Sequence, residues 1–271
     1  MNNLLRTEWL KIKYYRAFWW IIAFTALSYP GVNYISHNIY QELISKKDMA
    51  GNLAKMIMGT PFSFPEVWHT VAFFSSFFVF IPAIVVIMFV TNEYTFKTHR
   101  QNIIDGWSRN QFMTSKLIDV ALTTLLITIL YTIVCLAVGY MNLQDKAGSV
   151  WTQSYYIGLF ALQTFSQLSL AFLVGLLVRK AFIALGVFLF YYLIFERILE
   201  AYARYKWNDI GRFLPLEISD RLVPYPAFVG KVNPDSYQTA LNNIPIHILY
   251  TFILTTLVWL LCYRINNKRD L

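Results

Sequence analysis

Long apolar stretches alternate with short charged segments along the whole chain. Most of these stretches approach the roughly 20 residues that a helix needs to cross a membrane. The pattern therefore predicts an all-α integral membrane protein. The apolar run of the fifth span ends near Glu196, so we expect its helix to continue toward Ala203 with its charged part among the lipid headgroups. The six predicted transmembrane helices cover residues 17–36, 70–91, 117–141, 155–178, 181–200 and 245–263.

Two segments outside the spans have features of their own. Within residues 1–16, Leu5, Trp9 and Ile12 recur at helical spacing among basic residues, which predicts an amphipathic helix lying on the membrane surface; a frayed tail is the alternative. We expect residues 17–36 to be retained as a span and not cleaved as a signal peptide. The loop 197–244 combines apolar clusters with several prolines, which favours short segments that re-enter the membrane over a wet loop.

Composition and charge support a membrane location. Hydrophobic residues make up 57% of the chain and charged residues 14%, well below the roughly one quarter charged that is typical of soluble domains. If both termini are cytoplasmic, the inner segments hold 13 Lys and Arg in 52 residues and the outer segments hold 10 in 93. Basic residues are retained on the cytoplasmic side, so we predict a multi-pass protein of the plasma (inner) membrane with both termini inside. The net charge of +8 then indicates contact with anionic membrane lipid, and we expect no nucleic-acid partner.

The cytoplasmic loop between the second and third spans carries two helix-start signals. Thr98-His-Arg-Gln101 and Ser108-Arg-Asn-Gln111 both fit the capping box, in which a hydroxyl accepts from a backbone N–H and the Gln reaches back. Gly106 lies between them, where a helix end favours a residue that adopts positive φ. The loop therefore predicts a separate helix of about two turns at residues 98–105.

Catalytic and energy-coupling motifs are lacking. Gly230-Lys231 lacks the other residues of a phosphate-binding loop, and no charged residue lies at the centre of a predicted span. The four histidines are scattered, so we expect no metal site, and Cys135 and Cys262 are expected to be packing residues. The chain is predicted to be no enzyme and to hold no cofactor.

Together these features resemble the membrane-spanning permease subunit of ATP-binding-cassette exporters of the second type. The resemblance rests on the six-span layout, the interfacial first helix and the degenerate pattern Glu93-x-x-x-x-Thr98-x-Arg100 followed by Gly-x-Ser-Arg109 and Lys116. It implies that residues 98–105 are the coupling helix, which docks on a cytoplasmic ATPase subunit that binds ATP and Mg. In the family a glycine usually precedes the helix, where this chain has Lys97.

The resemblance also implies a set of partner-binding residues, with Ile103, Ile104 and Trp107 docking and the polar residues in contact. Alternatives stay open for several of them: basic residues also serve membrane topology, and Trp107 fits the aromatic belt at headgroup level. Glu93 with Lys97 and Asp105 with Arg109 fit helix-stabilising pairs at i, i+4. The full set is Glu93, Thr98, Arg100, Ile103, Ile104, Trp107, Arg109 and Lys116.

The functional hypothesis is a permease half that pairs with a second permease, usually its own copy, and with two ATPase subunits to drive export. Two alternatives remain at this point. One is a membrane-embedded lipid-modifying enzyme, and the other is a non-transporting sensor or resistance subunit that binds a peptide at its outer loops.

Overall fold

The computed structural model describes residues 13–45, 49, 52, 56, 58–104, 106–143, 149–207 and 209–268. These residues form helices joined by turns, with no strand among them, which confirms the all-α prediction. The predicted interfacial helix at residues 1–16 falls almost entirely outside the described residues. In chain order the helices are α2 (Arg16–Ser45), α4 (Val67–Ser76), α5 (Phe80–Thr95), α6 (Thr98–Ile104), α7 (Arg109–Met141), α8 (Tyr156–Val178), α9 (Ala181–Phe190), the π-helical η1 (Tyr191–Phe195), α10 (Glu196–Trp207), the 3₁₀ turn η2 (Ile210–Phe213), α11 (Pro215–Asp220), α12 (Ala227–Gly230) and α13 (Pro234–Lys268).

Four segments of the described chain are long and apolar enough to cross a membrane: α7, α8, the run Ala181–Trp207 and α13. They coincide with four of the predicted spans. A fifth is reached if α4 and α5 count as one span bent by 50°. The 30-residue α2 is not among them. The six-span count is therefore not confirmed.

The second predicted span is broken, where the sequence suggested one continuous helix. The break at residues 77–79 precedes Pro82 in the first turn of α5. Pro82 has no N–H to donate, and its ring would clash with the carbonyl four residues earlier in a continuous helix.

The region predicted as a loop at 197–244 is largely helical at both ends. α10 extends the fifth span to Trp207, and α13 begins at Pro234 instead of 245. Asn233 starts α13, because its side-chain oxygen accepts from the backbone N–H of Ser236 at 3.2 Å and Pro234 occupies the first helical position. Pro245 lies inside the helix, so the predicted start of the last span at residue 245 was wrong.

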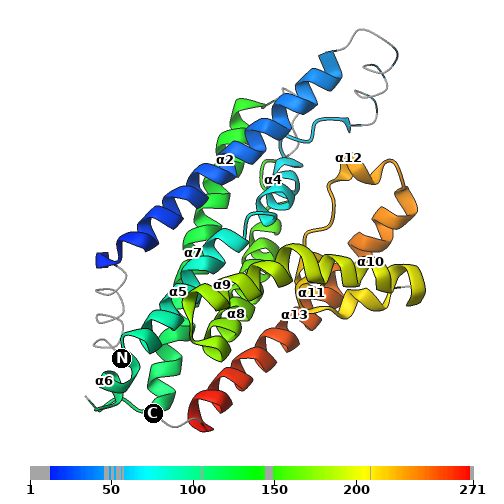
Figure 1. Ribbon diagram of the computed structural model, residues 1–271. Helices are drawn as coiled ribbons and strands as arrows, with labels where there is room; N and C mark the ends of the chain where they lie inside the picture. Colours follow the sequence, from blue (N-terminus) through cyan, green and yellow to red (C-terminus); the bar gives the residue numbers. More distant parts are fainter. Residues whose placement is uncertain are drawn as a thin grey trace.

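The helix α8 is the centre of the bundle and contacts α4, α5, α7, α9, α11 and α13. Its Gly175 allows α5 to approach closely, since a Cβ there would lie 2.3 Å from a methyl group of Val90. The buried core on each side is built from aliphatic and aromatic side chains such as Val71, Tyr131 and Phe160 in one cluster and Ile87, Phe172 and Trp259 in the other. Figure 1 shows α6 at one end of the bundle, beside the carboxyl-terminal end of α13 (red); we refer to this as the α6 end.

Candidate partner-binding site

The short helix α6 lies between two residues with positive φ, one before it and one after it. Lys97 before it has φ 56° and Gly106 after it has φ 99°. A left-handed conformation costs an L-residue about 1–2 kcal/mol and a glycine almost nothing. The glycine that usually stands before the coupling helix in the exporter family would suit the backbone observed at position 97. Here Lys97 adopts that left-handed conformation.

The predicted capping box at Ser108 is confirmed. The hydroxyl of Ser108 accepts from the Gln111 backbone N–H at 3.1 Å, and the Gln111 side chain accepts from the Ser108 N–H at 2.8 Å. The backbone N–H of Trp107 donates to the Asn102 carbonyl at 3.0 Å, which closes α6. The end of α6 and the start of α7 are therefore fixed within a few residues of each other.

The capping prediction for Thr98 is wrong. The Gln101 backbone N–H donates to the Lys97 carbonyl at 3.4 Å, so Thr98 is already inside the helix. The Thr98 hydroxyl instead donates to a carboxylate oxygen of Glu93 at 2.5 Å. A hydrogen bond to a charged group is stronger than one between neutral groups, so this contact fastens α6 to the end of α5.

A buried ion cluster lies directly beneath this contact. The Lys116 ammonium is 2.9 Å from the Glu93 carboxylate and 3.3 Å from that of Asp119. Lys116 is 3% exposed and Glu93 is 5% exposed, so both are enclosed by this chain. Two carboxylates and one ammonium in a poorly hydrated place stabilise one another only while all stay paired. Glu93 and Lys116, expected as partner contacts, thus hold α5 to α7 beneath α6.

Arg109 connects α7 to the end of the chain's last helix. Its guanidinium donates to the Asn267 carbonyl at 2.7 Å, and the Asn266 side chain donates back to the Arg109 carbonyl at 3.1 Å. The last carbonyls of a helix have no partner within it, so the Arg109 guanidinium supplies a hydrogen-bond donor to one of them. Its positive charge also interacts favourably with the negative end of the helix dipole. One turn further, the hydroxyls of Thr114 and Tyr263 are 2.8 Å apart.

The turn between α8 and α9 also lies against this site. Arg179 is in the left-handed conformation, with φ 59°, and its guanidinium lies 4.5 Å from the ring centre of Tyr94 on α5. The Tyr94 ring in turn contacts that of His99 on α6, at 4.6 Å between centres. A guanidinium over an aromatic face is attracted to it. Through Tyr94, α6 is therefore also connected to the turn between α8 and α9.

The outer surface of this end exposes two large apolar side chains among basic ones. Ile104 is 84% exposed and Phe96, in the turn before α6, is 72% exposed; Arg100 is exposed as well. Ile103 and Trp107 are partly buried within the chain. Sequence analysis missed Phe96, although its position beside a charged loop was a usable signal. A cavity of about 210 Å³ opens next to it, lined by Tyr15, Phe89, Asn92, Glu93, Phe96 and Thr98.

The eight residues expected to bind a partner thus separate into two groups. Four lie on or beside α6 without a side-chain contact described above: Arg100 and Ile104 are exposed, and Ile103 and Trp107 are partly buried. The others make contacts within the chain that the sequence did not reveal, because their partners are 5 to 158 positions away: Glu93, Thr98, Arg109 and Lys116.

Comparison with known protein families assigns residues 41–271 to a family described as "Protein of unknown function (DUF2705)". The chain belongs to this family. No curated protein matches it. The description of the DUF2705 family gives no activity, so the function has to be inferred from the geometry of the site.

Proposed function

We propose that this chain is the permease subunit of an ATP-driven exporter and that α6 is its docking helix for a separate cytoplasmic ATPase. ATP and Mg are then bound by that partner and not by this chain. The permease acts with a second permease subunit, its own copy in the simplest assembly. This function agrees with the resemblance in the loop at residues 92–116 and with the helical architecture.

The observation that carries the proposal is the exposure of Ile104 on the short helix α6 and of Phe96 in the turn before it. Most other exposed apolar side chains of the described residues lie on long helices, where lipid can cover them, and a smaller set lies in turns and short segments away from α6, such as Phe77, Trp151 and Val232. Those of α6 are flanked by Lys97, Arg100 and Arg109, which belong in water or headgroups. An apolar surface in that position is buried most simply against another protein.

The bundle also concentrates basic residues at the α6 end. Lys97, Arg100 and Arg109 meet there with the Arg179-Lys180 turn and with Arg264 and Lys268 near the end of α13. Basic loops remain cytoplasmic, so we orient the α6 end inward, in the plasma membrane. In this orientation α2 and the bent pair α4–α5 complete six crossings.

The contacts around α6 supply a route for coupling. A displacement of α6 acts on α5 and α7 through Thr98, Glu93 and Lys116, and on α8–α9 through His99, Tyr94 and Arg179. Closure of an ATPase dimer would press on two such helices and shift the packing of the membrane helices between discrete states. The substrate would pass between the two permease subunits.

Photocrosslinking tests the docking assignment. We place benzoylphenylalanine at position 104 or, as a control, at position 141, because Met141 is also 84% exposed but lies at the opposite end of α7. Irradiated cells should yield a crosslink from position 104 to a protein that carries a phosphate-binding loop and hydrolyses ATP, and none from position 141. If position 104 yields no such partner, or position 141 captures the same ATPase, the proposal is wrong.

A further inference from the structure

The carboxylate of Asp220, at the end of α11, is held by two helices. On one side the buried side chains of Gln163 and Gln167 of α8 donate to one of its oxygens at 2.9 and 2.7 Å. On the other side the guanidinium of Arg197 of α10 donates to its second oxygen at 2.6 Å. The last residue of α11 is therefore fixed between neutral amides and one cation.

The amides that hold this carboxylate lie near the middle of α8, and the Asp220 side chain itself is 19% exposed. Gln167 is 11 residues after the start of α8, or roughly 16 Å along the axis at 1.5 Å per residue. The hydrocarbon layer is about 30 Å thick, so the amides that hold Asp220 extend to about its middle. Ionised groups at such depth are expensive and usually belong to a binding or transport path.

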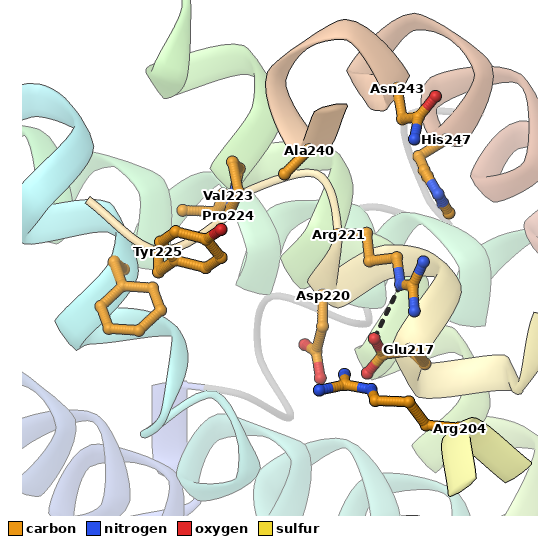
Figure 2. A pocket seen from close by; sticks show the side chains of 11 residues that line it. Arg204, Glu217, Asp220, Arg221, Val223, Pro224, Tyr225, Ala240, Asn243 and His247 are labelled. Atoms are coloured by element: carbon orange, nitrogen blue, oxygen red, sulfur yellow. Dashed lines mark hydrogen bonds and ion pairs between the residues drawn. The ribbon is translucent and has the colours of Figure 1, made fainter. Parts of the chain in front are cut away.

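Two cavities meet at Asp220. The first, of about 250 Å³, has charged residues on one side and Val223, Pro224 and Tyr225 on the other, as Figure 2 shows. The second, of about 300 Å³, includes Ser76, Tyr192 and Arg197. Both cavities are lined by the same three residues, Phe73, Asp220 and Val223, which we call the partition. Asp220 is the ionisable member of the partition, so the charge common to both cavities is negative.

Arg197 and Arg221 differ in how firmly they are held. Arg221 is bidentate to Asp209, at 2.6 and 2.9 Å, and also donates to Glu217 at 2.8 Å. Its hydrogen bonds lower the pKa of Asp209, which keeps that carboxylate ionised. The Arg197 side chain is 46% exposed, with Glu217 as a second carboxylate at 3.6 Å. Arg197 is thus the cation that a ligand can displace.

An acceptor lies unused beside Asp220. The side-chain oxygen of Gln163 is buried and has no hydrogen-bond partner among the described residues, while its amide nitrogen donates to Asp220. This oxygen lies outside both cavity linings, so Gln163 contributes to the site through its hydrogen bond to Asp220. The carboxylate of Asp220 and the apolar walls together favour an amphipathic ligand with a cationic nitrogen.

We propose that the two cavities are halves of one binding site for an amphipathic amine, whose charged nitrogen replaces the Arg197 guanidinium at Asp220. Arg197 fills the position when no ligand is bound. The apolar body of the ligand lies against Phe73 and Val223. This assignment is independent of the ATPase-docking proposal, because binding is a property of this chain alone.

The test uses a pair of probes with the same chain and opposite charge, octylamine and octanoate. The full chain is reconstituted in phosphatidylcholine nanodiscs, and binding is measured calorimetrically against empty nanodiscs. The wild type should bind octylamine saturably and octanoate at least about tenfold more weakly. Asp220→Asn should weaken octylamine binding by about tenfold or more, and Asp235→Asn, which alters an exposed carboxylate on α13, should not.

The direction in which Arg197→Gln changes octylamine affinity decides between a ligand site and a structural ion pair. Removal of the competing guanidinium should tighten octylamine binding severalfold, whereas a merely structural ion pair would lead to weaker binding in this variant. The proposal is overturned if octanoate binds as well as octylamine, if no saturable binding exceeds that of empty nanodiscs, or if Arg197→Gln leaves binding unchanged or weaker. None of these results bears on whether α6 docks an ATPase.

Discussion

The ammonium group of Lys116 lies 2.9 Å from the carboxylate of Glu93, although the two residues are 23 positions apart and on different helices. The Glu93 carboxylate also accepts a hydrogen bond from the hydroxyl of Thr98 on α6. One buried ion pair therefore joins the end of α5, the exposed helix α6 and the first turns of α7. These contacts attach α6 to both α5 and α7.

Replacement of Lys116 by methionine should destabilise the fold. The variant leaves the Glu93 and Asp119 carboxylates buried without their ammonium, for which we expect a loss of about 3–5 kcal/mol. Thermal unfolding in nanodiscs measures this loss. Adding Glu93→Gln to the variant should recover part of the stability by removing one charge. Lys180→Met is the control, because Lys180 is exposed at the same end; equal losses in both lysine variants would refute the role of the cluster.

Thr98 should act through its hydroxyl alone. Thr98→Val retains the shape but removes the donor to Glu93, at a cost of about 1.5–3 kcal/mol for a hydrogen bond to a charged group. The amides of α6 should then exchange hydrogen faster, while those of α8 remain unchanged. Thr98→Ser keeps the donor and should exchange as the wild type does. Equal protection of α6 in the valine and serine variants would show that the hydroxyl has no such role.

Arg109 should stabilise the end of α13. Arg109→Ala removes the donor to the Asn267 carbonyl, so the last turn of α13 should lose protection against hydrogen exchange. Arg264→Ala serves as the matched control, since this arginine is exposed in the same region. The assignment fails if the last turn of α13 is equally protected in the wild type and the Arg109 variant.

Periodicity and start signals in the sequence predicted the helical class, the four long spans and the separate helix beginning at Thr98. These features depend on local patterns: an apolar run of sufficient length, the Ser108 capping box and the positive φ at Gly106. Local patterns failed where tertiary structure decides. The last span was predicted to start at residue 245, but its helix begins at Pro234 and contains Pro245, and the predicted continuous second span is broken just before Pro82.

The polar contacts of the site could not be derived from the sequence. In the sequence, Lys116 indicates membrane topology; its pairing with Glu93 follows from the fold. Gln163 and Gln167 carry no charge that would single them out in an apolar span. Glu93 pairs with Lys116, whereas Lys97, its alternative i, i+4 partner, lies in a left-handed turn and is exposed. Such contacts follow from packing between elements far apart in the chain.

The proposed orientation can be tested with single cysteines in a background that lacks Cys135 and Cys262. A cysteine at Arg100 should react with an impermeant reagent only after the cells are opened, whereas a cysteine at Lys231 should react in intact cells. Both residues are exposed, so access depends on the side of the membrane. Reaction of position 100 in intact cells would reverse the orientation.

The central claim is that the exposed surface of α6 binds an ATPase, and Ile104→Asp tests it most directly. Ile104 is 84% exposed, so a carboxylate there is tolerated by the fold, but burial in a partner's groove would leave it unpaired and unfavourable. We would purify the wild type, Ile104→Asp and the control Met141→Asp in mild detergent, then measure the bound ATPase and its ATP hydrolysis. The account predicts that the wild type and Met141→Asp retain an active ATPase and that Ile104→Asp inserts normally but loses it. Retention of equal ATPase by Ile104→Asp, or its absence from the wild type, would contradict the account.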